Sequence, residues 1–581
     1  MIEKGHPIYA LLGLDIGCLN TRSSLICISD GKYRLGGFNI VPTSRGHGLN
    51  LSTSTDAVIN GLQDKIDAPA VGGAFGTSDH MLNRYVDGFA LAFSAGHRLR
   101  TVLLGLTRNG SLAAGRALID SLPLDLTAAF GLPALADERK VIDDITHIRP
   151  EILVVTGGED AGADEPMRRW IEIIRLVCRL LPETIQPAVI YAGNPSLESS
   201  FRRRLEPLTA VHIVPNLQPL YGEMDLTPAQ AVLDAAIMKE WKRSVPGLDD
   251  LLALPNNRAK TESFALARMV RYLSRAKKRD EFSITQSGIL AVDLGGSSTK
   301  LSAGLHGWTG TVIHYSQNGE VAQEDIEGVH QWTAAHVSRG EVGRYLSMQS
   351  CHPAIVPETS VELALSNALA RVRLQKTSAL FSRHYPWFNY RRGKGLMNHY
   401  EPMIASGAVL TRAPKRGQAM LTLLDGLQPW GITTMVLDKH HILPLLGVMG
   451  EFEPVLPIHM LDSDAFENLG TIISPVGDAV KGDTILVIHI TTDAGKDYSV
   501  EIEQGTLKRM VIPQGVTAEL DLEPERKTDI GFGERGKGGR LKVLGGSLGV
   551  VIDARGRAIR LPEDDDLRVD ELQRWIWTLG D

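Results

Sequence analysis

The sequence predicts an α/β protein with largely parallel sheets, followed by a β-rich C-terminal domain. Over about the first 450 residues, short apolar stretches alternate with stretches of helical period, which is the pattern of strands and helices that alternate along a chain. After about Glu451, hydrophobicity alternates with period two between Gly and Asp turns, which is typical of antiparallel strands. A chain of 581 residues is also too long for a single hydrophobic core.

The first third of the chain begins with three short strands and a helix, predicted at Leu11–Ile16, Ser24–Ile28, Arg34–Val41 and Ser54–Leu62. Further apolar runs end in small or turn residues, as buried parallel strands do. These strands are predicted at Arg100–Leu106 and within EILVVTGGEDAG, PAVIYAGN and AVHIVPN, with an amphipathic helix over Met167–Leu181.

The middle of the chain is mainly helical around one strongly apolar hairpin. Thr227–Pro228 supplies a capping hydroxyl and a proline at the first helical position, so we expect a helix from there to about Trp241. Further helices are predicted over about Glu262–Lys277 and Val361–Arg373, whereas 381–400 is predicted to be an aromatic, basic loop. We place the domains at 1–220, 221–454 and 455–581, the last ending in a short helix near Arg568–Leu579.

Composition argues against several classes of function. The net charge of −7 lacks the basic excess of a general nucleic-acid-binding protein. The four cysteines have no Cys-x-x-Cys spacing, and no window approaches the ~18 apolar residues of a membrane span. Because no secretory signal is recognisable either, we expect a protein of the reducing cytoplasm.

The segment ILAVDLGGSSTKLSAGL, Ile289–Leu305, carries the strongest chemical signal. An apolar strand ends at Asp293, turns on glycines, offers hydroxyls and returns as a second strand. Glycines and hydroxyls let a phosphate approach backbone N–H groups, and a carboxylate can hold Mg²⁺ through water. The predicted phosphate-binding residues are Gly295, Gly296, Ser297, Ser298 and Thr299 besides Asp293, with Lys300 as an additional charge. The alternative is an ordinary β-turn.

The segment LLGLDIGCLNTRSSLICI, Leu11–Ile28, repeats this pattern in weaker form. Asp15, Gly17, Thr21 and Arg22 are the predicted ligand-binding residues, and Cys18-Leu19 stand where hydroxyls would be more useful. Two such hairpins facing each other would hold one polyphosphate from both sides. Asp15 and Asp293 would then position Mg²⁺ through water. An ordinary turn is again the alternative.

Two other patterns predict no site. GFGERGKG at 531–538 matches a Gly-rich nucleotide motif but follows no buried strand and precedes no helix. Asp438 beside His440–His441 suggests metal ligands, but an apolar run follows, so we expect a structural role for these residues.

Taken together, the two hairpins resemble the actin/Hsp70/sugar-kinase superfamily, and MIASGAVLTRAP at 403–414 resembles its adenosine motif, with Ser406 and Gly407 close to the base and ribose. A generic strand–helix turn is the alternative for that motif. The ordered set LDIG, HRLRTVLLGL, EILVVTGGEDAG, AVIYAGN, VDLGGSSTK, SGAVLTRAP and VLDKHHILPLLG is similar to the glutamate-mutase accessory family MutL/GlmL, unrelated to mismatch-repair MutL. The resemblance covers about residues 8–450.

This resemblance implies a two-lobed actin-like ATPase with ribonuclease-H-like lobes, ATP and Mg²⁺ as cofactors, and reactivation of an adenosylcobalamin-dependent mutase as the client. It also implies candidates for orienting the attacking water. These are Glu159 and Asp160, in the turn that corresponds to a family Gly-Gly-x-Asp-Gly-Gly element, and Glu341, in place of a family aspartate.

Three alternatives stay open at this point. An actin-like filament or scaffold would self-associate according to its nucleotide state. A small-molecule kinase would transfer the terminal phosphate to an acceptor instead of water. A nucleotide-binding scaffold with little turnover would explain Cys18-Leu19 in the first hairpin.

Overall fold

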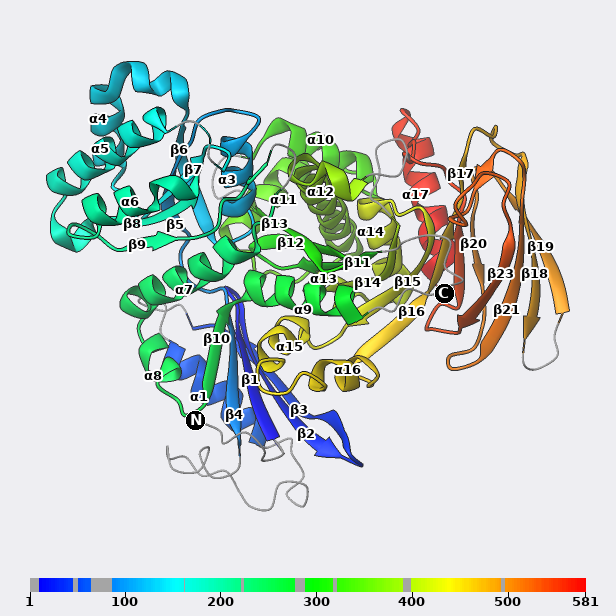
Figure 1. The fold of residues 1–581 in the computed structure, drawn as a ribbon. Helices are drawn as coiled ribbons and strands as arrows, with labels where there is room; N and C mark the ends of the chain where they lie inside the picture. The colour runs from blue at the N-terminus through cyan, green and yellow to red at the C-terminus, as the bar shows by residue number, and fades with distance from the viewer. Residues whose placement is uncertain are drawn as a thin grey trace.

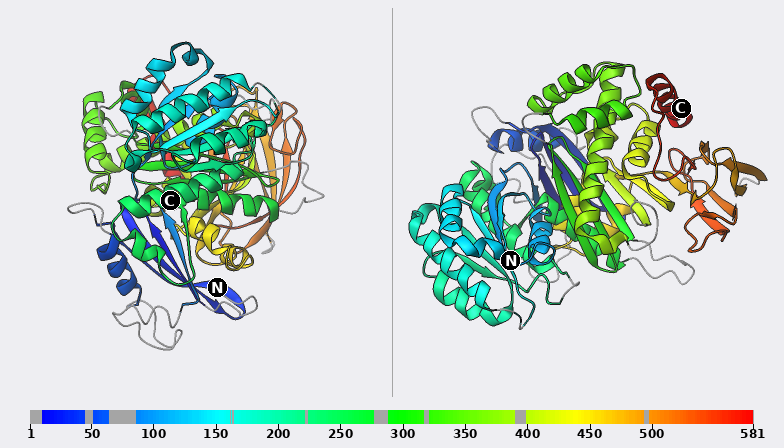
Figure 2. Two further views of the ribbon diagram at one scale, coloured as in Figure 1. Left: turned by 60° about the vertical axis from the view of Figure 1, so that its left-hand side comes forward. Right: turned by 90° about the horizontal axis from the view of Figure 1, so that it is seen from above.

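The computed structural model describes residues 10–44, 51–63, 86–160, 162, 164–220, 224–276, 288–316, 321–389, 399–492 and 497–580. It contains two α/β lobes, an α/β domain inserted in the first lobe and a β-rich C-terminal domain (Figures 1 and 2). The predicted α/β class with a β-rich C-terminal domain is therefore confirmed.

The first lobe is built on a five-stranded sheet in the order β10-β4-β1-β2-β3. Strands β1, β2 and β3 form an antiparallel meander, while β4 and β10 run parallel to β1. Every residue of β1 is buried, which explains why its sequence is a continuous apolar run rather than an alternating one. The elements are β1 (Ala10–Ile16), β2 (Asn20–Ser29), β3 (Lys32–Pro42), α1 (Leu51–Gln63), β4 (Gly88–Phe93) and β10 (Asn257–Thr261).

The second lobe repeats this arrangement at one end of a larger sheet, in the order β13-β12-β11-β14-β15. Its first three strands are again an antiparallel meander, and β14 and β15 run parallel to a fully buried first strand, β11. The strands are β11 (Gly288–Leu294), β12 (Ser298–Leu305), β13 (Trp308–Tyr315), β14 (Tyr400–Ser406) and β15 (Gly431–Asp438). Because both sheets have the ribonuclease-H-like order, the fold is the predicted two-lobed actin-like one.

Helices connect and cover the sheets of the two lobes. Helix α12 packs on β12 and β13 and against α10 and α14, and α9 leads from β10 of the first lobe into β11 of the second. The helices are α7 (Thr227–Ser244), α8 (Leu248–Leu252), α9 (Glu262–Ala276), α10 (Gln323–Trp332), α11 (Arg339–Cys351), α12 (Ser360–His384), α13 (Ala408–Thr411), α14 (Arg416–Leu427), α15 (Leu443–Met449) and α16 (Leu456–Leu461).

The inserted domain has its own parallel sheet, in the order β6-β5-β7-β8-β9. It lies at the upper left of Figure 1, beyond α7. Its elements are β5 (Leu99–Leu104), α3 (Ser111–Ile119), β6 (Leu124–Phe130), α4 (Glu138–Ile148), β7 (Ile152–Gly157), α5 (Glu165–Leu180), β8 (Ala188–Gly193), α6 (Glu198–Leu205) and β9 (Val211–Ile213). The predicted first lobe therefore contains two separate sheets.

The C-terminal domain packs on the far edge of the second lobe's sheet. β16 (Phe466–Ser474), β20 (Leu507–Met510) and β24 (Val550–Asp553) extend that sheet, and a separate sheet has the order β19-β18-β21-β23. The remaining elements are β17 (Val476–Gly477), β18 (Thr484–Thr492), β19 (Asp497–Glu503), β21 (Thr517–Pro524), β22 (Thr528–Asp529), β23 (Gly539–Leu544) and α17 (Asp565–Gly580).

Several predicted boundaries differ from the structure. The boundary at 220 does not separate the lobes, because β10 is the edge strand of the first sheet, and the boundary at 455 cuts off β16, which continues the second. Helix α12 is longer than its predicted 361–373 and runs into the stretch 381–400 that was predicted to be a loop; 390–398 in that stretch, and Lys277 after α9, lie outside the described residues. Among the helices described here, none is long and apolar enough to cross a membrane.

Helices α9 and α15 cross between the lobes at very short range, and both contact β4 and β10 of the first lobe. A Cβ on Gly447 would lie 2.0 Å from the Ala265 carbonyl oxygen, so the α15 backbone rests directly on the α9 backbone. We expect Gly447→Ala to force the two helices apart and to lower the free energy of unfolding by about 1–3 kcal/mol. Urea unfolding measures this change. Gly450→Ala is the matched control, because its Cβ would meet its nearest atom at 3.4 Å, and an equal effect of both variants would contradict the prediction.

Candidate functional site

Each lobe ends its central hairpin with an acid–base pair across the two strands. In the first lobe Asp15 lies opposite Arg22, and Arg22 Nη1 is 2.5 Å from Asp15 Oδ2. In the second lobe Asp293 lies opposite Lys300, and Lys300 Nζ is 2.9 Å from Asp293 Oδ2. The same strand register, with the base seven positions after the acid, thus gives both lobes the same paired charges.

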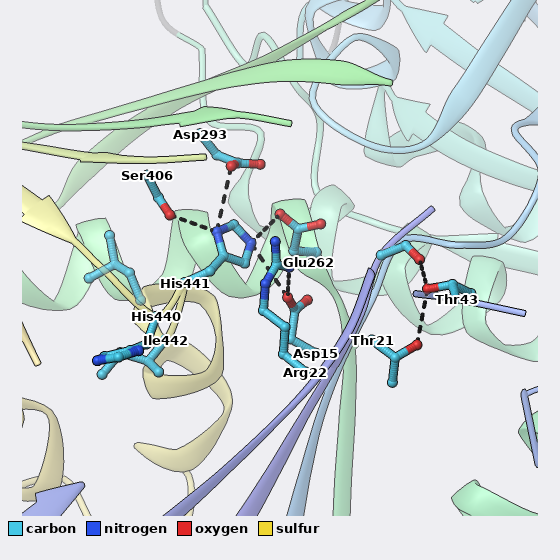
Figure 3. A network of polar contacts seen from close by, with 12 residues as sticks. Asp15, Thr21, Arg22, Thr43, Glu262, Asp293, Ser406, His440, His441 and Ile442 are labelled. Atoms are coloured by element: carbon cyan, nitrogen blue, oxygen red, sulfur yellow. Dashed lines mark hydrogen bonds and ion pairs between the residues drawn. The ribbon is translucent and has the colours of Figure 1, made fainter. Parts of the chain in front are cut away.

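Two further side chains join these pairs into one network (Figure 3). Glu262 begins α9, directly after the fifth strand of the first sheet, and its Oε1 accepts a hydrogen bond from Lys300 Nζ at 2.7 Å. His441 follows the fifth strand of the second lobe and lies between the acids: Nε2 is 3.2 Å from Glu262 Oε1 and 3.7 Å from Asp15 Oδ2, and Nδ1 is 3.5 Å from Asp293 Oδ1. The network therefore brings Asp15 and Asp293 of opposite lobes to the two sides of one imidazole.

The hydrogen bonds of His441 indicate that both ring nitrogens carry a proton. Ser406 Oγ donates to the Asp438 carbonyl oxygen at 3.3 Å and so accepts from His441 Nδ1, 2.9 Å away. Nε2 donates to the Glu262 carboxylate. Burial alone would lower the pKa of His441, but Asp293 and Asp15 outweigh it and raise that pKa to about 9.

The pKa values of the other members of the network are set by two opposing effects, burial and the neighbouring charges. Burial would raise the pKa of Glu262, but Lys300 and His441 outweigh it and hold that pKa well below its ordinary value. Burial would lower the pKa of Lys300, but Asp293 and Glu262 raise it. For Asp15, burial raises the pKa against the attraction of His441 and Arg22. Because neither Glu262 nor His441 titrates near neutral pH, the site favours electrostatic positioning over proton transfer.

A cleft of about 1190 Å³ lies between the lobes above this network. Hairpin turns from both lobes, the turn after β14 and the α11–α12 region form its walls. Lining residues include Gly17, Cys18, Leu19, Asn20, Arg22, Glu262, Asp293, Gly295, Gly296, Ser297, Ser298, Lys300, Cys351, Arg373, Gly407, Ala408 and His441. The volume exceeds the few hundred Å³ that a small metabolite needs and is large enough for a nucleotide.

The tips of the two hairpins touch at one end of the cleft. A Cβ on Gly296 would lie 2.1 Å from Leu19 Cδ1, so any side chain at position 296 would displace Leu19. Leu19, where a hydroxyl was expected to be more useful, therefore makes an apolar contact between the lobes.

Most of the predicted ligand-binding residues meet at the cleft, but four of them do not line it. Asp15 is fully buried beneath Arg22 and His441. Thr21 Oγ1 bonds Thr43 Oγ1 at 3.0 Å, and Thr43 in turn donates to the Gly17 carbonyl at 2.8 Å, so Thr21 braces the hairpin. Thr299 is buried away from the cleft, and Ser406 is committed to His441. Gly407 does line the cleft, at a φ of 115°.

The three predicted catalytic carboxylates lie elsewhere. Glu159 and Asp160 are in the turn after β7 of the inserted domain, where Asp160 Oδ1 accepts from Asn216 Nδ2 at 3.0 Å. Glu341 is exposed and caps the N-terminus of α11 through Ser338. None of the three is among the described residues that line the cleft.

The prediction of a structural role for His440 and His441 holds for one of them. His440 packs against Phe38, with ring centroids 4.6 Å apart, and points away from the carboxylates (Figure 3). His441 is the centre of the network. The sequence signal that could have found it is positional: Glu262 and His441 occupy equivalent places, each just after the fifth strand of its lobe.

The family model described as MutL protein matches residues 11–465. The chain belongs to the MutL protein family. Solved structures similar to this MutL-family chain share little sequence with it. They include an acetate kinase from Entamoeba histolytica (10% identity, 76% of this chain and 100% of that chain, TM-score 0.24) and a glucokinase from Balamuthia mandrillaris in complex with glucose (12%, 77% and 94%, 0.25). A third is the Aquifex aeolicus PPX-GPPA enzyme (10%, 70% and 70%, 0.16). No curated protein matches the chain.

Proposed function

We propose that this MutL-family chain binds ATP with Mg²⁺ in the cleft, hydrolyses it, and uses the resulting lobe movement to reactivate an adenosylcobalamin-dependent mutase. The observation that carries the nucleotide part is the pair of equivalent hairpins whose aspartates, Asp15 and Asp293, meet on one imidazole beneath a shared cleft. Family membership supports the mutase as client.

The chemistry of the acids fits a magnesium ion held through its waters. Asp15 and Asp293 each already pair with a basic side chain, which disfavours direct coordination. Asp15 Oδ1 has no hydrogen-bond partner among the described residues, and it would accept from a metal-bound water if Arg22 and His441, which cover it, moved aside. A bound Mg²⁺ would neutralise charge on the phosphates.

The chain's own residues would position the triphosphate and exclude bulk water. The turn Gly295–Ser298 offers glycines and hydroxyls to the phosphates, and Gly407 lets the nucleoside approach the backbone. In hydrolysis a water oxygen bonds to the terminal phosphorus, the bond to the bridging oxygen breaks, and ADP, phosphate and a proton leave. Glu262 is the cleft carboxylate that contacts Lys300 of the second hairpin and His441, and it replaces Glu159, Asp160 and Glu341 as the candidate to orient that water. Because such transfer depends mainly on positioning and charge, no covalent nucleophile is needed.

Substitution of Asp293 tests the proposal. We expect Asp293→Asn to lower kcat for ATP hydrolysis by about tenfold to a hundredfold, because the variant loses the carboxylate charge that faces the cleft. A phosphate-release assay measures the change, with circular dichroism to confirm folding. Asp462→Asn, a surface aspartate with a side chain 74% exposed, is the matched control. Hydrolysis by Asp293→Asn at the wild-type rate would contradict the proposed mechanism.

The client is tested separately by a pull-down from native lysate with and without ATP. We expect an adenosylcobalamin-dependent mutase to be captured, in an amount that depends on ATP. ATP-dependent filaments would instead support the actin-like alternative.

A nucleotide-binding scaffold with little turnover is one further alternative. Leu19 favours it, because this side chain contacts Gly296 of the other hairpin and offers no hydroxyl to the phosphates. Tight binding of ATP without phosphate release would support it.

A further inference from the structure

A second, smaller hollow of about 100 Å³ continues from the cleft beneath the turn of the second hairpin. The two spaces share Gly296, Ser297, Ser316 and Arg373 in their walls. The hollow has the volume of about three molecules of liquid water, so it can hold a small ion but not a nucleoside. It therefore adjoins the turn Gly296–Ser297, whose backbone and hydroxyl are proposed to hold the phosphates.

Arg373 of α12 brings to this hollow a positive charge that no described carboxylate contacts directly; Asp325, which also lines the hollow, is paired with Lys376 instead. Among the described residues no carboxylate lies within 4.0 Å of its guanidinium; the one polar contact of that group is a long hydrogen bond from Nη1 to the Gly296 carbonyl at 3.5 Å. Other basic side chains nearby are neutralised: Lys376 pairs with Asp325 at 2.5 Å, and Arg371 with Asp425 at 2.7 Å. Since a guanidinium has five N–H donors and burial lowers the pKa of Arg373, an anion beside it would be strongly favoured.

A hydroxyl in the wall of the same hollow also lacks a partner. Ser316 Oγ is buried and has no hydrogen-bond partner within the part of the chain that the structure describes. A buried hydroxyl without a partner is costly, and an oxyanion would accept a hydrogen bond from it. The guanidinium and the hydroxyl thus require the same kind of ligand, independently of each other.

We propose that Arg373, assisted by Ser316, binds a tetrahedral phosphate at the turn Gly296–Ser297. The shared chemistry is a phosphate oxyanion, either the terminal phosphate of a bound nucleoside triphosphate or the inorganic phosphate released from it. A planar guanidinium matches two phosphate oxygens at once, which a lysine cannot do. The proposal rests on the proposed nucleotide site and assigns to Arg373 the discrimination between triphosphate and diphosphate.

Isothermal titration of the full chain with ATP, ADP and inorganic phosphate tests the proposal. We expect Arg373→Ala to weaken ATP binding by about ten- to a hundredfold, the usual effect of a charge-assisted hydrogen bond, and to change ADP binding less than about twofold. Arg373→Lys should lie between, because it keeps the charge but not the fork. Arg383→Ala, an exposed arginine on the same helix, is the matched control.

The titrations with inorganic phosphate identify the source of the ligand. Phosphate binding to the wild type with ADP present, lost in Arg373→Ala, assigns the site to the product as well as to the triphosphate. A loss of affinity for ATP alone in Arg373→Ala, with no binding of inorganic phosphate, assigns the site to the bound triphosphate.

Two results would overturn the proposal. One is that wild type and Arg373→Ala bind ATP and phosphate with equal affinities; the other is that the variant loses affinity for ATP and ADP equally. A wild type that binds phosphate through Arg373 but neither nucleotide would support this inference and contradict the proposed function. A wild type that binds neither nucleotide nor phosphate would overturn both.

Discussion

Replacement of Arg555 by methionine is expected to lower the free energy of unfolding by about 2–4 kcal/mol, because two buried carboxylates each lose one of the two arginines that pair with them. Asp553 keeps only Arg557, and Asp425 keeps only Arg371. The Arg555 side chain is 1% exposed. Its Nε and Nη2 atoms each donate to Asp553 at 2.8 Å, and Nη1 lies 2.8 Å from Asp425 Oδ1. Its guanidinium also lies 4.3 Å from the ring centroid of Trp575 on α17. Asp553 belongs to the C-terminal β24 and Asp425 to α14 of the second lobe, so Arg555 fastens the two parts together.

The electrostatics of this cluster support a large effect. Burial would raise the pKa of Asp553, but Arg555 and Arg557 outweigh it and hold that pKa below its ordinary value. Burial would lower the pKa of Arg555, and Asp553 and Asp425 raise it. Each side of the network therefore stabilises the charged form of the other, and removal of one member leaves part of the desolvation cost of the rest uncompensated.

Equilibrium unfolding in urea measures the loss, with Arg540→Met as the matched control. Arg540 also pairs with two carboxylates, Glu519 and Asp521, but its side chain is 75% exposed, so we expect a change below about 0.5 kcal/mol. Equal midpoints for the Arg555 variant and the wild type would show that the buried network contributes nothing. A separate early transition in the Arg555 variant alone would show that the C-terminal domain has been released from the lobe.

The hairpins could be predicted because their signals are local. A buried central strand is a continuous apolar run, and an aspartate followed by glycines at its end is visible within ten residues. The partner base is equally local, since Arg22 and Lys300 lie seven residues after their acids. The two turns that line the cleft, one from each lobe, were thus found from sequence alone.

The rest of the site could not be predicted, because it depends on contacts between distant segments. Glu262 and His441 are 179 residues apart, and each by itself has the context of an ordinary helix start. Arg373 lies on a helix whose sequence does not show which face meets the hairpin turn. Glu159, Asp160 and Glu341 were chosen by resemblance to family elements, and that resemblance did not show which carboxylates reach the cleft.

The sheet to which a strand belongs is also a long-range property. β10 has the sequence NRAKT and is largely polar because it is an edge strand, so it has no apolar pattern to find. The apolar strands of the first lobe and of the inserted domain have the same buried character. Their pattern predicts a parallel sheet but not two separate ones.

The pH dependence of stability should show that His441 is held as a cation. Its pKa is about 9 in the folded protein against an ordinary value of 6.5, so folding takes up a proton between these values. The stabilisation is fully present below pH 6.5 and is lost as the pH rises through about 9. We expect the free energy of unfolding to fall by about 3 kcal/mol over that window, which is the free-energy equivalent of the difference between the two pKa values. Urea unfolding at a series of pH values, in the presence of a chelator and without nucleotide, measures the slope.

The variant His441→Gln separates this effect from the rest of the chain's titration. Glutamine can bond Ser406 and Glu262 but cannot take up a proton, so the slope between pH 6.5 and 9 should largely disappear while the protein stays folded. His97→Gln is the control: His97 pairs with Glu151 at 3.0 Å, but its side chain is 49% exposed, so solvent screens the pair and its removal should leave the slope almost unchanged. A wild-type slope retained in His441→Gln would mean that the imidazole between Asp15 and Asp293 is neutral. A neutral imidazole can bind a metal, so a metal ion bound directly to Asp15, Glu262 and His441 would then become the better explanation of the cluster.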